Sequence, residues 1–212
     1  MRCLICDHPA DAFYDERLKV ETYHCRQCAC IFKSQATHQA LAAQKSRYDL
    51  HENNPEDAGY RAYFQRFLDV VLPLVGTPKR ALDFGCGRSR LLSEMLAEQG
   101  MVCDAYDPIY HPDTAYHTHT YDLIVSTEVF EHLHDPKMVF GALLDRLDIG
   151  GYLAIQTQFH SNSVEAYQTW YYRQDPTHIV FFTPQTFRAL CGRSGCTYVG
   201  DNGKNILVLR KR

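Results

Sequence analysis

Cysteine and histidine are the reactive side chains of this sequence that most need an explanation, since its 212 residues contain nine cysteines and eleven histidines. Near the start, the pattern C-x2-C-x18-C-x2-C is formed by Cys3, Cys6, Cys25 and Cys28. Each CxxC turn directs two thiolates toward one ion, and this spacing is typical of structural sites that hold zinc in a tetrahedron. A segment this short buries too little apolar surface to fold alone. We therefore predict a zinc ribbon over residues 1–35, stabilised by a structural Zn²⁺.

Alternative ligands and roles for the ribbon stay open. Cys30 could replace Cys28. His8 or His24 could supply a ligand, and the CxxC pairs could instead be redox-active or incidental reduced thiols. Residues 1–35 carry five basic and five acidic side chains, and four thiolates around one zinc add about two negative charges. Because this balance gives no electrostatic footprint for phosphate groups, a lid, a substrate-binding face or a dimer contact is as well supported as a nucleic-acid module.

The composition excludes several classes of protein. A net charge of −3 excludes a generally basic nucleic-acid-binding protein, and a hydrophobic fraction of 45% excludes whole-chain disorder. No apolar run is long enough for a membrane span or a signal peptide. We therefore expect a cytoplasmic protein with reduced cysteines, in which one ordinary domain carries a small attachment.

A second group of residues with chemical potential follows an apolar run. Residues 81–84 predict a buried strand, and Gly85-Cys86-Gly87 comes directly after it. Glycine has no Cβ, so the backbone here can approach a ligand closely, and the next helix offers unpaired amide groups. A dinucleotide fingerprint needs Gly or Ala where Arg90 stands, and a Walker loop needs a lysine that this turn lacks. The turn therefore indicates a ligand site of another kind.

Alternating strands and helices must position these groups. Apolar residues at helical spacing over 60–75 predict a helix that ends at Gly76, and a polar helix is expected over 37–48. Further helices are expected over 89–99, 135–147 and 183–193, strands over 101–106, 121–126 and 152–157, and a terminal hairpin over 196–200 and 205–209. This order predicts an α/β fold with a mostly parallel sheet and an antiparallel C-terminal hairpin, which binds ligands at the carboxyl ends of its strands.

The pattern D-x-G-x-G, formed by Asp83, Gly85 and Gly87, resembles motif I of the class I S-adenosylmethionine-dependent methyltransferases. Three further segments resemble motifs of that superfamily, in order: the strand that ends at Asp107, the segment 121–133 with its E-x-x-E-H-L signature, and the turn 148–153 into the next strand. The resemblance implies a Rossmann-like fold and S-adenosyl-L-methionine as cofactor. It also implies that Asp107 accepts hydrogen bonds from both ribose hydroxyl groups.

Two other segments extend the resemblance over essentially the whole chain. Residues 47–55 and 171–182 resemble a bacterial family of methyltransferase-domain proteins that also begin with a CxxC…CxxC ribbon. The resemblance implies three parts, which are the zinc ribbon (1–35), N-terminal helices that cover the cofactor site (36–78) and the S-adenosylmethionine-binding methyltransferase domain (79–212). The cofactor contacts that it implies are Tyr48, His51, Asp83, Gly85, Cys86, Gly87, Asp107, Pro108, Ser126, Thr127 and Glu128. Ordinary helix packing is the alternative for the first two.

The sequence departs from the general pattern of the superfamily. Ser89 stands where motif I usually has a third glycine, and Ile149 replaces the usual proline before the fifth strand. Only fourteen residues separate Asp107 from Asp122, whereas a complete crossover with helix and strand needs about thirty. We therefore predict a shortened third-strand region with at most a stub strand over 114–118. The residue that contacts the adenine is expected close by, with the candidates Thr118, His119 and Thr120.

Histidines that follow the strands are the candidates for proton transfer. A sulfonium methyl group is already electrophilic, so the enzyme mainly aligns the acceptor and excludes water, and a hydroxyl or acidic carbon also needs a base. His132 and His178 are the candidate bases. Glu128 is a further catalytic candidate, and Glu128 or Glu131 could orient either histidine. The alternatives are packing or helix capping for His132, loop anchoring for His178 and solvated charge for the glutamates.

Several other residues have alternative interpretations. An acceptor pocket or the core could contain Trp170, Tyr171, Tyr172, Phe181 and Phe182. The pairs His117-x-His119 and His132-x-His134 could each face a second metal, but the spacing fixes no third ligand. Small buried residues, rather than reactive thiols, are expected at Cys86, Cys103, Cys191 and Cys196.

Taken together, the motifs predict an S-adenosylmethionine-dependent methyltransferase (EC 2.1.1.-) that acts on an oxygen or carbon atom of a small-molecule acceptor. The chain lacks, after residue 126, the N-P-P-[YF] motif of methyltransferases that modify exocyclic amines of nucleic acids. The alternatives are an RNA or protein methyltransferase that recognises its substrate through the ribbon, and a non-catalytic cofactor-binding scaffold. We expect neither a membrane nor a nucleic-acid partner, and a homodimer stays open.

Overall fold

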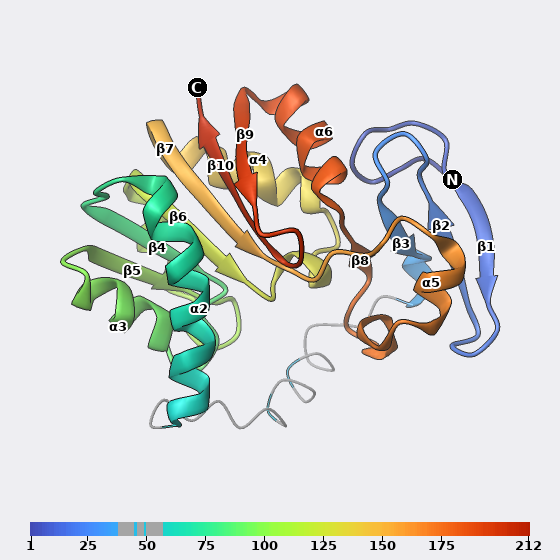
Figure 1. Cartoon of the computed structure of the whole chain (residues 1–212), viewed down its shortest axis with the longest axis horizontal. Helices are drawn as coiled ribbons and strands as arrows, with labels where there is room; N and C mark the ends of the chain where they lie inside the picture. The colour runs from blue at the N-terminus through green and yellow to red at the C-terminus, as the bar shows by residue number, and fades with distance from the viewer. Residues whose placement is uncertain (38–44, 46–48, 50–56) are drawn as a thin grey trace.

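The computed structural model describes residues 1–37, 45, 49 and 57–212, and two β-sheets organise this part of the chain (Figure 1). The strands of the larger sheet are β4 Arg80–Phe84, β5 Val102–Tyr106, β6 Tyr121–Thr127, β7 Leu147–Gln156, β9 Cys196–Asp201 and β10 Ile206–Lys211. Their order is β5-β4-β6-β7-β10-β9; the first four run parallel, while β10 is antiparallel to both β7 and β9. This confirms the predicted α/β sheet with an antiparallel C-terminal hairpin.

Helices cover both faces of this sheet (Figure 1). The covering helices are α2 Ala58–Val75, α3 Leu91–Glu98, α4 Pro136–Arg146 and α6 Pro184–Ser194. Helix α5 Val164–Thr169 lies beside the smaller sheet, and the short 3₁₀ helices are η1 Gln35–Thr37, η2 Thr114–Thr118, η3 Phe130–His132 and η4 Tyr171–Gln174. Ala81 and Leu123 belong to the core that α2 and α3 share, whereas Leu82 and Ile124 belong to the core with α4 and α6. Consecutive strand residues thus serve opposite faces, as the period of two requires. None of the described helices is long and apolar enough to cross a membrane.

Local signals set the starts of the helices. Asp57 caps α2 by accepting a hydrogen bond from the Gly59 amide. Asp135 caps α4 in the same way, and Thr183 with Thr186 forms a reciprocal capping box at the start of α6. The last two starts agree with the sequence prediction. Most of the helix predicted over 37–48 lies outside the described residues.

Strand β7 differs from its predicted form, whereas the third-strand region agrees with it. β7 begins at Leu147, five residues before the predicted start at Tyr152, because the double-glycine turn stays within the strand as an irregularity. A Cβ on Gly151 would meet the Tyr121 carbonyl oxygen at 3.0 Å, so a side chain there would push β7 away from β6. The predicted shortening of the third-strand region is confirmed, because residues 114–118 form the 3₁₀ helix η2 and β5 is the edge of the sheet.

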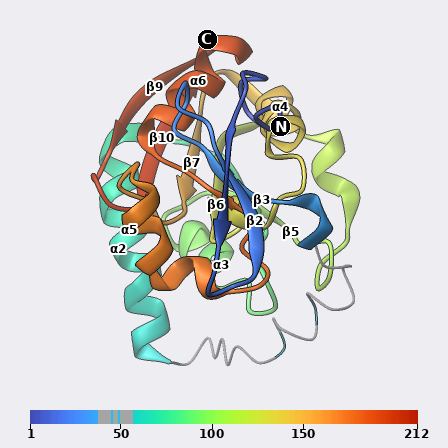
Figure 2. The same ribbon diagram turned by 90° about the vertical axis from the view of Figure 1, so that its right-hand side faces the viewer.

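The predicted ribbon forms the smaller sheet, which the methyltransferase-like part of the chain completes. Its strands are β1 Asp11–Asp15, β2 Val20–His24, β3 Ile31–Lys33 and β8 Val180–Phe181, all paired antiparallel in this order. Figure 2 looks onto β1, β2 and β3, which lie side by side. The four ribbon cysteines belong to the same buried core as Leu143 of α4 and Phe187 of α6. The domain boundaries predicted at residues 35 and 78 stay predictions. The first boundary separates residues that share one continuous hydrophobic core.

Candidate functional site

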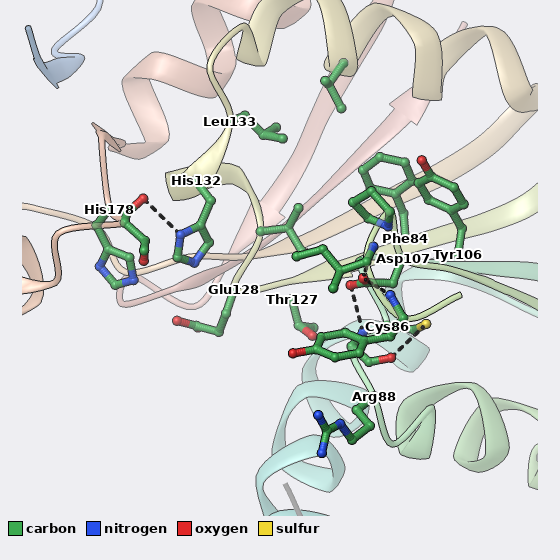
Figure 3. Close-up of a pocket in the computed structure, with 18 of the residues that line it drawn as sticks. Phe84, Cys86, Arg88, Tyr106, Asp107, Thr127, Glu128, His132, Leu133 and His178 are labelled. Carbon is green, nitrogen blue, oxygen red and sulfur yellow. Dashed lines mark hydrogen bonds between the residues drawn. The ribbon is translucent and has the colours of Figure 1, made fainter. Parts of the chain in front are cut away.

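A cavity of about 820 Å³ lies at the carboxyl ends of β4, β5 and β6, where the sequence predicts the ligand site (Figure 3). Figure 3 shows Cys86 and Asp107 at one end, His132 and His178 at the other, and Thr127 between them. Ligand pockets in proteins usually measure about 300–1,000 Å³, so this cavity has the size of a ligand-binding pocket. We call the first end the glycine end and the second the histidine end.

Contacts with neighbouring segments shape the glycine loop, which consists of Gly85, Cys86 and Gly87. The amides of Gly85 and Cys86 donate to the Tyr106 carbonyl at 2.7 and 3.1 Å. Gly85 has φ +82°, and a Cβ there would meet Cγ2 of Val129 at 2.2 Å, so this position cannot carry a side chain without displacing Val129. A Cβ on Gly87 would meet nothing within 4 Å, which leaves a backbone that a ligand can approach.

Asp107 joins the glycine loop to the loop after β5. Its Oδ1 accepts hydrogen bonds from the amides of Ile109 and Tyr110 at 2.8 and 3.0 Å, and its Oδ2 accepts from the Gly87 amide at 3.2 Å. The carboxylate therefore holds both loops in place while it lines the cavity. An acid in this position can accept further hydrogen bonds, since two carboxylate oxygens offer about four lone pairs.

The structure brings most of the predicted cofactor contacts together. Those that line the cavity are Gly85, Cys86, Gly87, Asp107, Pro108, Thr127 and Glu128. Asp83 and Ser126 are buried and do not line it. Asp83 accepts a hydrogen bond from the Ser93 hydroxyl at 2.9 Å, and burial raises the pKa of its carboxyl to about 7. Tyr48 and His51 lie outside the described residues.

The adenine candidates do not line the cavity, whereas a group of aromatic rings does. His119 donates instead to Oδ2 of Asp104 at 2.9 Å, and neither Thr118 nor Thr120 is a lining residue. Phe84 and Tyr106 line the glycine end and stack with ring centres 5.4 Å apart. Sequence reasoning treated both only as strand residues, although each is the last residue of a strand that points at the site.

Both predicted histidines lie at the histidine end, and main-chain carbonyls orient them. His132 donates from Nδ1 to the Thr177 carbonyl at 3.0 Å, and His178 donates from Nδ1 to the Tyr172 carbonyl at 2.7 Å. Their ring centres are 4.7 Å apart. Burial lowers the pKa of both imidazoles, that of His178 to about 3 with the neighbouring His132 as the second cause. Both rings are therefore neutral near pH 7, with the Nε2 lone pair able to accept a proton.

Two carboxyl groups and two phenols lie close to the histidines. The Tyr172 hydroxyl contacts Oε2 of Glu128 at 2.9 Å and also contacts Glu131, while the Tyr63 hydroxyl donates to Oε1 of Glu128 at 3.1 Å. Burial and then the charge of Glu131 raise the pKa of Glu128 to about 8, and burial raises that of Glu131. Because the pKa of Glu128 is raised above 7, the pair retains a proton at neutral pH.

The glutamates do not orient the histidine rings as expected, because main-chain carbonyls accept the hydrogen bonds from both rings. Nε2 of His132 lies 3.9 Å from Oε1 of Glu131, which is too long for a hydrogen bond. The roles of Tyr63 and of the Tyr172 carbonyl could not be predicted from the sequence, because Tyr63 lies on a helix face and Tyr172 contributes its main chain. Among the described residues, His132 and His134 do not belong to one group of possible metal ligands. His132 instead lies with Glu131 and His178, with ligand atoms within 4.8 Å of one another.

The four predicted cysteine ligands form one buried cluster in the ribbon. Sγ atoms of Cys3 and Cys28 are 3.5 Å apart, as are those of Cys6 and Cys25, and all four lie within 4.8 Å of one another. These distances are too long for a disulfide of about 2.05 Å and close to the roughly 3.8 Å edge of a tetrahedron with Zn–S bonds of about 2.3 Å. Cys30, a possible replacement ligand, directs its thiol to the Ile31 carbonyl. The donor set fits a tetrahedral metal and is consistent with a zinc ribbon.

Comparisons with known proteins agree with this geometry. A family model described as "Methyltransferase domain" matches residues 57–200. None of the curated proteins matches the chain in sequence.

Solved structures share the fold. Magnesium protoporphyrin IX methyltransferase from Synechocystis PCC 6803 is 12% identical with a TM-score of 0.54, and the match covers 84% of this chain and 98% of that chain. The 1,6-didemethyltoxoflavin-N1-methyltransferase of Burkholderia thailandensis is 15% identical with a TM-score of 0.55, covering 89% and 98%. An O-methyltransferase family protein from the same organism is 13% identical with a TM-score of 0.54, and the match covers 79% of this chain but only 62% of that one. These matches concern the fold alone.

The family match covers more than half of the chain, and membership of this family implies S-adenosylmethionine as the cofactor. S-adenosylmethionine fits the glycine end, because an open main-chain surface at Gly87 lies beside the acid Asp107. The chain belongs to the methyltransferase domain family, and it is a class I S-adenosylmethionine-dependent methyltransferase with an N-terminal four-cysteine cluster.

Proposed function

We propose that this enzyme methylates an oxygen or an acidic carbon atom of a small molecule, with His132 as the general base. The observation that carries the proposal is the pair of neutral histidines, fixed by main-chain carbonyls at the end of the cavity opposite the glycine loop. When bound, S-adenosylmethionine supplies an electrophilic methyl group on a sulfonium. The cofactor contacts inferred from the sequence, including Asp83, Ser126, Tyr48 and His51, stay part of this proposal.

The two histidines are assigned different roles. A base works best when its pKa is near the working pH. The pKa of His178 is lowered to about 3, so we assign it to positioning, and His132, whose depression has no second histidine among its causes, to proton transfer. Nε2 of His132 takes the acceptor's proton, while its Nδ1–H keeps the hydrogen bond to the Thr177 carbonyl. The single negative charge retained by Glu128 and Glu131 favours the imidazolium that forms.

A small acceptor is favoured by the cavity and by proteins of the same fold. The cavity is bounded on several sides by apolar and aromatic residues such as Tyr63, Phe64, Leu133 and Val139. Two similar structures carry the names of methyltransferases for magnesium protoporphyrin IX and for 1,6-didemethyltoxoflavin. We further propose that Zn²⁺ occupies the four-cysteine cluster, since a four-thiolate set is typical of structural zinc.

The proposal is tested with isotopically labelled S-adenosylmethionine and zinc-loaded protein. The labelled methyl group should enter the small-molecule fraction of a metabolite extract, and the His132→Gln variant should be slower by about 10²- to 10⁴-fold, with an unchanged affinity for S-adenosylhomocysteine. His117→Gln is the matched control, because His117 is exposed and does not line the cavity. Label in RNA or protein instead would refute the small-molecule acceptor. Equal activity of the two variants would refute the role of His132.

A further inference from the structure

The third strand of the ribbon is joined directly to the loop that carries His178. In the pairing of β3 with β8, Ile31 lies opposite Phe181 and Phe32 opposite Val180. The Lys33 amide donates to the Ile179 carbonyl at 2.9 Å, which extends this pairing to the residue next to His178. Figure 1 shows β3 and β8 next to each other, with β4 and β5 on the far side of the molecule. The ribbon thus borders the histidine end and is remote from the glycine end.

Lys33 is buried, and its ammonium group is bound to the same loop. Nζ donates to the main-chain carbonyls of Arg173 at 2.9 Å and Asp175 at 3.1 Å, and the whole residue is only 4% exposed. A buried charge is tolerated only where hydrogen bonds replace its water. These two carbonyls therefore cannot move away without leaving the ammonium group unsatisfied. The loop from Tyr171 to His178 is held at its middle by a residue of the ribbon.

A second ribbon residue holds the loop from the other side. Arg173 is 1% exposed and pairs with Asp15, at the end of β1, over 3.2 Å between Nη1 and Oδ2. The cysteine-bearing turns are themselves bound to the main domain. The Thr186 hydroxyl donates to the Cys28 carbonyl at 2.9 Å, and Nε2 of His160 donates to the Ala29 carbonyl at 2.8 Å. The metal cluster, the ribbon strands and the loop form one continuous set of buried contacts.

The held loop supplies the acceptors that orient both histidines. The Tyr172 carbonyl accepts from His178 and the Thr177 carbonyl accepts from His132, so a shift of the loop turns both rings. We propose that Lys33 is a positioning residue through which the metal-loaded ribbon sets the loop Tyr171–His178, and with it the orientation of His132 and His178. Loading of the four-cysteine cluster then controls the histidine end of the cavity and leaves the glycine end intact. This inference rests on the proposed function only in assigning the histidines to the acceptor.

The test compares Lys33→Met with Lys19→Met in zinc-loaded protein labelled with ¹⁵N-histidine. Lys19 is the matched control, because it belongs to the same ribbon and its side chain is exposed. NMR of the ring nitrogens reports the tautomer of His178, whose signal is assigned by its loss in His178→Gln. The native protein and the control should show a single Nδ1–H tautomer, and Lys33→Met should show averaging of the two nitrogens. The affinity for S-adenosylhomocysteine should change less than about twofold, while methyl transfer falls on the order of 10²-fold.

Zinc removal from the native protein is the second measurement, and it applies even if Lys33→Met does not fold. Chelation should give the same averaging at His178, and added Zn²⁺ should reverse it. The inference is overturned if His178 keeps its native signal in Lys33→Met or after zinc removal. It is also overturned if cofactor affinity falls as strongly as activity, since the effect would then be global. The tautomer is measured without cofactor or acceptor, so absence of methyl transfer by the native protein would refute the proposed function alone.

Discussion

The buried ion pair between Asp15 and Arg173 gives the sharpest quantitative prediction for stability. Asp15→Asn removes the negative charge but keeps the oxygen that accepts from the Arg17 and Leu18 amides at 3.1 and 3.0 Å. The change is thus confined to the side facing Arg173, where the two charges lie 3.2 Å apart and are almost fully buried. Nε and Nη1 of Arg173 have no hydrogen-bond acceptor among the described residues, so the carboxylate is their main compensation.

The expected loss follows from the geometry in two ways. Coulomb's law at 3.2 Å with an effective dielectric constant of about 20 gives about 5 kcal/mol. Removing one partner of a buried pair typically costs about 3–5 kcal/mol, because the other charge stays buried. We therefore expect Asp15→Asn to lower the free energy of unfolding by about 3–5 kcal/mol, a large part of the roughly 5–15 kcal/mol that a domain has.

Urea unfolding of zinc-loaded protein, followed by tryptophan fluorescence, measures this loss. The sequence has a single tryptophan, Trp170, whose ring centre lies 5.0 Å from that of Tyr172 in the loop held by the ribbon. The control is Asp11→Asn, which breaks an exposed ribbon pair with Arg26 and should cost less than about 1 kcal/mol.

Two results would refute the reasoning. One is an Asp15→Asn loss no larger than that of Asp11→Asn. The other comes from the double variant Asp15→Asn with Arg173→Met, which removes the stranded cation and should recover part of the loss. A double variant less stable than Asp15→Asn alone would show that the buried charge is not the cause.

Three further predictions follow from the same contacts. Asp107→Ala should weaken S-adenosylhomocysteine binding by about 1–3 kcal/mol, because ribose hydroxyls and the Gly87 amide lose their acceptor, and calorimetry showing unchanged affinity would contradict this. Metal analysis should find one zinc per chain, lost with Cys3→Ser or Cys25→Ser; no zinc would refute the ribbon, and a second equivalent would point to the group around His132. Burial lowers the pKa of His160 to about 4, so its contribution of about 3 kcal/mol to the free energy of unfolding is present above pH 6.5 and is lost as the pH falls toward 4. The variant His160→Gln should flatten the dependence of unfolding free energy on pH in this range, and an unchanged dependence would contradict the prediction.

Local pattern was enough for the elements and for the glycine end. Periodicity gave α2, β4 and β6 with nearly correct bounds, because neighbours in sequence determine whether a helix or strand forms. Parallel strands end at the same edge of a sheet, so Gly87 and Asp107 could be expected to meet before their contact was seen. The four cysteines were recognisable for a similar reason, since the spacing within each CxxC turn is itself local.

The histidine end was predictable in its residue types but not in its connections. His132 and His178 were identified from their motifs, yet the sequence suggested that glutamates would orient them. The structure assigns that task to the carbonyls of Tyr172 and Thr177. Burial raises the pKa of Glu128 and Glu131, and the Tyr172 hydroxyl that contacts both of them lies more than forty residues further along the chain. No spacing rule covers a contact of that length.

The chain's own pattern of residues thus predicted a methyltransferase fold, a ligand site at the carboxyl ends of the strands and a ribbon with a four-cysteine cluster. Folding in three dimensions was needed to show that the ribbon borders the histidine end. β8 has only two residues, which is too few to show a periodic pattern. It pairs with β3, which lies near the other end of the sequence. Lys33 binds carbonyls 140 and 142 residues away. Every residue carries a main-chain carbonyl, so such partners leave no mark in the sequence, and only the packing of distant segments selects them.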